Sequence, residues 1–254
     1  QLASRISVRS CDKFIRKNAT RRYYSPLDWQ PMKKLIAPAL FALFLAACGD
    51  IPTTLTYNVT FTTEDSGRMT DLSLATRHVV ERRLSRLEGN LIDYDIDYDE
   101  ESKATTIEVE VDNAKAAAVL NEEMITPFTF EVRYLVEEAE EGDITVEGAG
   151  SFRATGIDKS YVDWVVGQTT EPPLNRGRVL IGFTDDSAEQ VQTLFTEQAG
   201  NTIGLFVRGR LTAAVQIDGE FEKVLVIEGL PSGEIAKIFA DDMNVGIHMI
   251  FTNP

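Results

Sequence analysis

The chain has 254 residues, and 25 Lys and Arg against 40 Asp and Glu give it a net charge of −15 at pH 7. Residues 1–47 hold nine of the basic and two of the acidic residues, so the remainder carries 16 basic and 38 acidic residues, a net charge of −22. A surface this acidic repels nucleic-acid phosphates and anionic headgroups, which excludes nucleic acid as a partner and a basic patch as a membrane anchor.

Residues 32–47 have the layout of a signal peptide, with Lys33 and Lys34 before an apolar run over residues 35–47. Thirteen residues rise about 20 Å as a helix, less than the ~30 Å hydrocarbon core, so a permanent span is not expected. The segment Leu45-Ala46-Ala47-Cys48 resembles the lipobox of bacterial lipoproteins. That resemblance implies that Cys48 is acylated and becomes the first residue of the mature chain. A buried apolar helix with a chance cysteine is the alternative.

The chain before this signal is basic and does not begin with methionine. We interpret residues 1–31 as an upstream extension assigned in error, with an organellar transit peptide as the alternative. Residues 48–54 then form a lipidated tether, and no disulfide is expected because Cys11 precedes the signal and Cys48 is modified. We expect a protein held by lipid on the extracytoplasmic face of a bacterial membrane. Gly49 after the cysteine leaves both inner and outer membrane open.

Residues 55–136 predict a first domain of alternating strands and amphipathic helices. The expected elements are, in chain order, a strand at 57–61, a helix at 72–87, strands at 91–99 and 105–111, a helix at 114–124 capped by Asn113, and a strand at 128–136. This βαββαβ order is the ferredoxin-like split pattern, in which two helices cover one face of an antiparallel sheet.

Alternating aspartates follow one face of the strand at residues 91–99, which raises the question of a metal site. A calcium loop needs glycine at its sixth position and a closing glutamate, whereas Tyr98 occupies that position. Alternate side chains of a strand also point the same way without wrapping around an ion. We therefore expect a solvated acidic face and no metal. Its members are Asp93, Asp95, Asp97 and Asp99.

An acidic and glycine-rich linker is expected at residues 137–150, followed by a second α+β domain over 151–254. In this domain Ser187 and Gln190 have the spacing of a capping box before a helix. A hairpin is predicted around the turn Arg208-Gly209-Arg210. Ser232 is expected to cap a last helix, and residues 246–251 to form a final strand.

Catalytic and cofactor motifs are not found. His78 and His248 stand outside any metal-binding or nucleophile motif, and the cap interpretation already accounts for Ser187. The glycines around the predicted hairpin, Gly200, Gly204 and Gly209, have the wrong spacing for a phosphate loop. We therefore expect neither an enzyme nor a cofactor.

Several segments are similar to the first periplasmic domain of SecD, a subunit of the bacterial protein-export machinery. They are Thr155-Gly156, the strand at 179–183, the run from Thr196 to Gly200, the hairpin strand at 203–210, and Ile227-Glu228-Gly229-Leu230. The earlier half, from Val80 through the first hairpin to Leu135, resembles the base of the same SecD domain. The resemblance covers nearly all of residues 56–251, through strand and turn positions without a catalytic signature.

Together with the expected lipid anchor at Cys48, this resemblance implies a protein that accompanies the Sec translocon and binds exported polypeptide. SecD itself continues into transmembrane helices that use the proton gradient, and no such run follows residues 246–251, so a proton-driven motor is not expected here. The residues selected for polypeptide binding are Phe206, Arg208 and Arg210 of the hairpin, with a solvated turn as the alternative. A structural or envelope lipoprotein without an export role is the other hypothesis, and a small ligand between the two domains a third.

Overall fold

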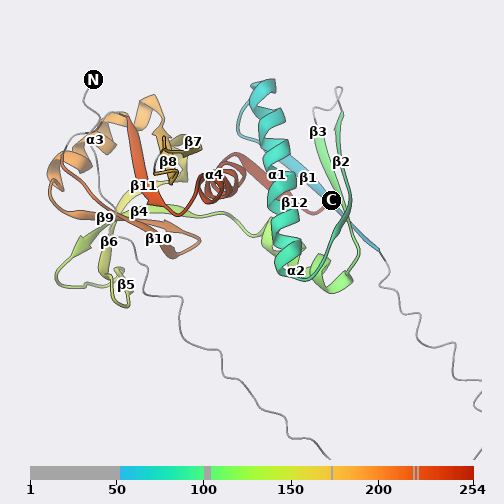
Figure 1. Cartoon of the computed structure of the whole chain (residues 1–254), viewed down its shortest axis with the longest axis horizontal. Helices are drawn as coiled ribbons and strands as arrows, with labels where there is room; N and C mark the ends of the chain where they lie inside the picture. The colour runs from blue at the N-terminus through green and yellow to red at the C-terminus, as the bar shows by residue number, and fades with distance from the viewer. Residues whose placement is uncertain (1–51, 100–103, 173, 220, 222) are drawn as a thin grey trace, which may run out of the picture.

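The computed structural model describes residues 52–99, 104–172, 174–219, 221 and 223–254. The expected signal peptide, the lipobox with Cys48 and residues 100–103, between the strands predicted at 91–99 and 105–111, lie outside this part of the chain. Two groups of sheets and helices lie side by side, and the α+β class is confirmed (Figure 1). Within the described residues, no helix combines the length and the apolarity that crossing a bilayer requires.

The first group is a four-stranded antiparallel sheet with two helices on one face (Figure 1). Its strands lie in the order β12-β1-β3-β2, which is the ferredoxin-like order. The strands are β1 (Thr53–Phe61), β2 (Leu91–Asp99), β3 (Ala104–Val111) and β12 (Met249–Thr252), and the helices are α1 (Ser66–Arg86) and α2 (Ala114–Ile125). Asn113 caps α2 as predicted, because its side chain accepts hydrogen bonds from the backbone N–H groups of Lys115 and Ala116.

The fourth strand of this sheet comes from the end of the chain, which corrects the predicted strand assignment. We expected residues 128–136 to complete the first sheet, but β4 (Phe130–Val136) lies between β9 and β6 in another sheet. Met249 and Phe251 instead point into the first core, beside Tyr57. Residues 130–230 therefore form a second group inserted between α2 and the pair α4–β12, and the expected linker at 137–150 contains a strand of that group.

The second group contains two antiparallel sheets. The five-stranded sheet has the order β10-β9-β4-β6-β5, with β5 (Ile144–Val146), β6 (Gly150–Asp158), β9 (Thr202–Val207) and β10 (Arg210–Gln216). The three-stranded sheet has the order β11-β8-β7, with β7 (Val162–Thr169), β8 (Gly177–Phe183) and β11 (Val224–Leu230). Helix α3 (Ala188–Glu197) and the short 3-10 turns η1 (Lys159–Tyr161) and η2 (Asp185–Ser187) complete it.

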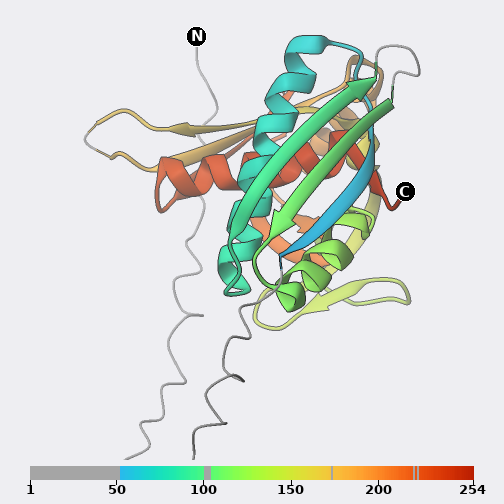
Figure 2. The same ribbon diagram turned by 90° about the vertical axis from the view of Figure 1, so that its right-hand side faces the viewer.

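Helix α4 (Gly233–His248) belongs to both groups. Its residues Ala236, Ala240, Met243 and Ile247 join the core of the second group, while Val245 joins the core of the first. The three-stranded sheet lies directly on α4 (Figure 2). Their backbones touch at Gly167, where an added Cβ would stand 2.3 Å from the Ala236 carbonyl oxygen.

The helix continues beyond Gly246, where the sequence predicted a strand, and ends at His248. The glycine serves packing here, because an added Cβ at Gly246 would stand 2.2 Å from the Phe128 ring. Ser232 caps the other end as predicted, since its Oγ accepts a hydrogen bond from the Ile235 N–H at 3.2 Å.

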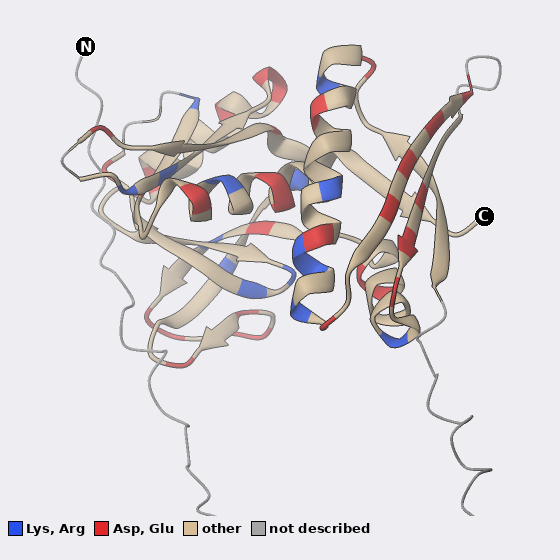
Figure 3. Ribbon diagram, turned by 45° about the vertical axis from the view of Figure 1, so that its right-hand side comes forward, with Lys and Arg blue, Asp and Glu red and all other residues tan. Residues whose placement is uncertain are grey.

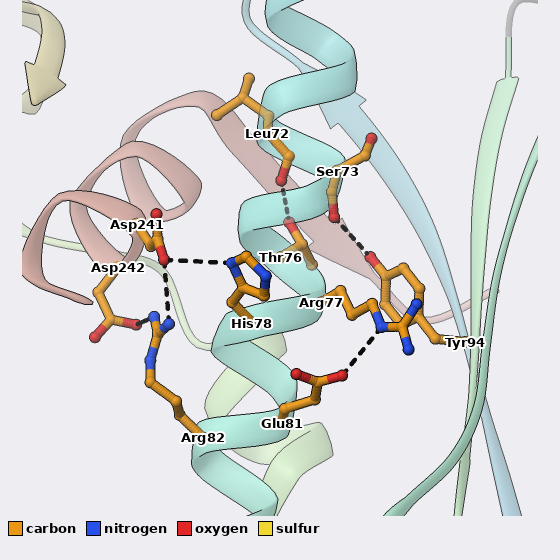
Figure 4. Close-up of polar contacts among 10 residues, drawn as sticks. All are labelled: Leu72, Ser73, Thr76, Arg77, His78, Glu81, Arg82, Tyr94, Asp241 and Asp242. Atoms are coloured by element: carbon orange, nitrogen blue, oxygen red, sulfur yellow. Dashed lines mark hydrogen bonds and ion pairs between the residues drawn. The ribbon is translucent and has the colours of Figure 1, made fainter. Parts of the chain in front are cut away.

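Polar contacts fix α1 against α4 (Figure 4). The Arg82 guanidinium donates to Asp241 at 3.1 Å and to Asp242 at 3.4 Å. His78, also on α1, lies 3.7 Å from Asp241. These side chains are partly exposed, so each ion pair contributes little to stability, but the fork of Arg82 fixes the relative position of the two helices.

The outer face of the first sheet is polar and strongly acidic, as predicted for β2 (Figure 3). The register places like charges directly opposite one another, Asp93 against Glu110 and Asp95 against Glu108. Ile92, an apolar residue next to these aspartates, is 50% exposed where the register shifts between Leu91 and Asp93. Within the described residues no group of three or more His, Cys, Asp or Glu side chains is placed to hold a metal ion.

Candidate functional site

The predicted hairpin is formed by β9 and β10, but its three selected residues have different environments. Phe206 is 1% exposed, and its ring packs edge-on against Phe152 at 5.4 Å between ring centres, with the Arg133 guanidinium 5.8 Å from its centre. It is not accessible to a partner. Arg208 and Arg210 are exposed. The turn between the strands has positive φ at both Arg208 and Gly209, which is typical of a tight two-residue hairpin turn.

Arg208 points toward the first group rather than away from the molecule. Its guanidinium lies 5.9 Å from the centre of the Phe128 ring and donates to the Glu123 carbonyl oxygen at 3.5 Å. Glu123 is in α2 and Phe128 follows α2. This side chain therefore marks the place where the two groups meet.

A second contact between the groups surrounds His248, which is 7% exposed. Arg68 of α1 donates to Nε2 of His248 at 3.1 Å, so Nε2 is the unprotonated nitrogen and Nδ1 donates to Thr62 Oγ1 at 3.0 Å. Arg68 also pairs with Asp163 of β7 at 3.2 Å and donates to its carbonyl oxygen. Burial first, and the charge of Arg68 second, lower the pKa of His248 to about 4. The neutral imidazole, hydrogen-bonded to Thr62 and Arg68, thus stabilises the contact between the two groups.

The capping box predicted at Ser187 is wrong. Ser187 lies at the end of η2 and makes no side-chain cap hydrogen bond to α3. Its oxygen instead accepts from the Thr184 hydroxyl at 2.8 Å, and its single hydroxyl hydrogen is shared between the carbonyl oxygens of Tyr161 and Thr184, at 3.1 and 3.0 Å. Gln190 accepts a hydrogen bond from the Tyr161 hydroxyl at 2.7 Å. Both residues hold the start of α3 against η1.

An apolar surface lies on the three-stranded sheet, on the face away from α4. The register aligns Val166, Leu180 and Val226 in one row across the three strands. In the next row Trp164 and Val224 flank Gly182, and an added Cβ at Gly182 would collide with the indole at 2.1 Å. We call these five side chains the apolar sheet face. They are Trp164, Val166, Leu180, Val224 and Val226.

The apolar sheet face is separate from both cores. Among the described residues none of its five members joins either buried cluster, and Val166 is 40% exposed while the other four are partly exposed. The third row, Gln168, Arg178 and Glu228, ends the surface with polar groups, and Arg178 donates to the Gln168 side chain at 2.9 Å. A contiguous apolar face with a polar rim is typical of an interaction surface.

This surface was not predicted from the sequence. Strand β8 also has Val179, Ile181 and Phe183 on its inner face, so apolar residues on both faces produce a continuous apolar run that reads as a buried strand. The signal that distinguishes the faces is Gly182 beside Trp164, which only the strand register makes visible.

The comparisons with known proteins concern solved structures only, since no protein-family model and no curated protein matches the chain. SecDF in a super-membrane-facing form is similar at 15% identity and a TM-score of 0.43, over 80% of this chain and 30% of that chain. A structure of SecDF described as a membrane component that enhances protein export is similar at 16% identity and a TM-score of 0.43, over 79% of this chain and 99% of that one. The translocon-associated SecDF of Thermus thermophilus is similar at 16% identity and a TM-score of 0.42. The chain spans about a third of the length of the first and the third of these SecDF chains.

Proposed function

We propose that this protein is a lipid-anchored, SecD-like accessory of protein export that binds exported polypeptide on the extracytoplasmic face of a bacterial membrane. In this proposal Cys48 carries the lipid, Sec translocon components are the neighbours, and the protein has neither catalysis nor a proton-driven motor of its own. The observation that carries the binding role is the apolar sheet face, with Val166 40% exposed at its edge.

The geometry of this face suits an extended, unfolded chain. Rows of apolar side chains run across three strands, and β7 and β11 are both edges of the sheet. An extended peptide can place alternate side chains on such a face or pair with an edge strand. The net negative charge of the whole chain disfavours acidic partners, so we expect apolar contacts to supply the affinity.

The test is site-specific photo-crosslinking in a bacterium that produces the full chain, with a secretory polypeptide arrested in the translocon. We expect a crosslinker at Val166 to capture the arrested polypeptide and one at Thr60, on the polar face of the first sheet, to capture none. Val166→Asp should reduce capture by a second crosslinker placed in the β7–β8 loop at Leu174, which is 68% exposed. Thr60→Asp, which adds the same charge, should not.

Capture at neither position, or equal capture at both, would reject polypeptide binding by this face. The hairpin is tested in the same assay with Arg208→Glu and Arg210→Glu together, because a loss of capture there would extend the binding surface to the turn.

The anchor and the neighbours are tested separately. Mass spectrometry of the mature N-terminus is expected to find an acylated Cys48, and Cys48→Ser should release the protein from membranes. Recovery with Sec translocon components under mild detergent supports the export role. Recovery with peptidoglycan or outer-membrane proteins instead would favour the structural envelope role.

A further inference from the structure

A small cavity opens where the two groups meet, and its walls combine cations with apolar side chains. Its volume is about 190 Å³. The cations are Arg83, Lys159 and Arg208, which come from α1, η1 and the β9–β10 turn. No Asp or Glu is among the described lining residues, although the chain as a whole has 40 acidic and 25 basic residues. The apolar wall is formed mainly by Met124, Phe128, Val245, Met249, Ile250 and Phe251.

The positive charge in this cavity is only partly compensated. Arg83 lies 3.5 Å from the Glu123 carboxylate and is 9% exposed. Arg208 reaches only the backbone carbonyl of the same residue, and Lys159 makes no ion pair with any residue that the structure describes. Burial first, and the nearby charge of Arg208 second, lower the pKa of Arg83. Three cations line the cavity, and although the nearby carboxylates of Glu123 and Asp242 both act on Arg83, neither residue lines the cavity, so an anion between the three cations would be stabilised there.

The cavity also runs along the free edge of a strand. Three consecutive residues of β12, Met249 to Phe251, line it, and since their side chains alternate between the two faces, the cavity lies at the edge of the sheet. β12 is the edge strand, and the Thr62 N–H bonds to the His248 carbonyl oxygen at 2.9 Å. The alternation of an antiparallel ladder then turns the N–H and C=O of Phe251 outward, away from β1.

We propose that this cavity binds the C-terminal residue of a peptide chain, with the carboxylate between Arg83, Lys159 and Arg208 and an apolar side chain against Met249 and Phe251. A terminal carboxylate matches Arg and Lys donors, and the outward backbone groups of Phe251 can pair with the preceding peptide unit. The volume holds one side chain and a carboxylate but not a long acyl chain. This site is distinct from the apolar sheet face and does not depend on an export role.

The test is calorimetric titration of the full chain, at low salt, with three probes: acetyl-Ala-Ala-Leu with a free carboxylate, the same peptide as its C-terminal amide, and hexanoate. We expect the free acid to bind and the amide and hexanoate to bind at least about tenfold more weakly, since a charge-assisted hydrogen bond contributes this much. Arg208→Gln and Lys159→Gln should each weaken the free acid about tenfold.

Arg176→Gln is the matched control, because it removes the same charge from an exposed loop without lining the cavity. It should leave the affinity unchanged. Equal binding of the free acid and the amide would overturn recognition of the carboxylate. Binding of hexanoate as tight as that of the free acid would overturn recognition of the peptide backbone. A loss of affinity in Arg176→Gln as large as in Arg208→Gln would show that only the net charge of the protein matters. Absence of binding by the free acid would reject the site.

Discussion

The buried hydroxyl of Tyr57 is an uncompensated polar group. The side chain is fully buried on the inner face of β1, and among the described residues its hydroxyl has no hydrogen-bond partner. Burial raises the pKa of this phenol well above its ordinary value, so the group stays neutral. A buried hydroxyl without a partner costs about 1–3 kcal/mol.

Replacing Tyr57 with Phe should therefore stabilise the protein. We expect Tyr57→Phe to raise the free energy of unfolding by about 1 kcal/mol in urea denaturation, because the ring and its edge contact with Phe251 remain. Tyr98→Phe, at a side chain that is 47% exposed, should change it by less than about 0.5 kcal/mol. A destabilised Tyr57→Phe variant would mean that the hydroxyl has a bound water as its partner.

His248 should make stability depend on pH in the weakly acidic range. Its pKa is lowered from 6.5 to about 4 in the folded state, so between these values the unfolded chain binds the proton more readily. The stabilisation is fully present above pH 6.5, decreases as the pH falls and is lost below about 4. This shift in the pKa of His248 corresponds to about 3 kcal/mol in the free energy of unfolding.

The measurement compares the wild type with His248→Gln in urea denaturation from pH 8 to pH 4. The wild type should lose about 3 kcal/mol more than the variant across this interval, since the carboxylates titrate in both. Parallel curves would show that His248 is protonated as easily in the folded protein as in the unfolded chain.

At the scale of elements, the β2–β3 hairpin contains repulsion that a single substitution can relieve. Asp95 faces Glu108, and opposed like charges on neighbouring strands destabilise a sheet. We expect Asp95→Lys to increase stability by about 0.5–1 kcal/mol at low salt, with the gain shrinking as salt screens the charges. Glu171→Lys, an equal change of charge in the exposed β7–β8 loop, is the control and should give a smaller gain. Stability of Asp95→Lys that equals the wild type at every salt concentration would contradict direct repulsion across the strands.

The elements also show what a sequence can and cannot predict. Local features succeeded: Asn113 and Ser232 cap their helices, and the alternation of β2 with β3 gave the hairpin and its acidic face. Strand partners that are distant in the sequence could not be predicted, because β4 and β12 have the same alternating pattern whichever sheet they join. Phe206 was misplaced for a related reason, since β9 is buried on both faces and its pattern does not distinguish core from surface. The apolar sheet face depends on such register, which leaves no local signal in the sequence.

At the scale of the whole molecule, the crossing of α4 and β12 joins the two groups into one cooperative structure. The same helix places Met243 and Ile247 in one core and Val245 in the other, and β12 follows it without a loop. Because helix stability in proteins comes mainly from tertiary contacts, loss of the packing of α4 in one group weakens the helix on which the other group packs. The two groups should therefore unfold together, although they have separate cores.

This coupling predicts that damage to the first core destabilises the second. Phe251→Ala removes a side chain that is 7% exposed and its edge contact with Tyr57, at a cost of about 3–5 kcal/mol. In hydrogen exchange, the most protected amides of β1 and of β8 should lose the same free energy of protection, and the fluorescence of Trp164 should report the same transition as circular dichroism. Ile250→Ala, on the same strand but 49% exposed, should cost less than about 1 kcal/mol. Loss of protection in β1 alone would show that the second group is stable without the strand that closes the first.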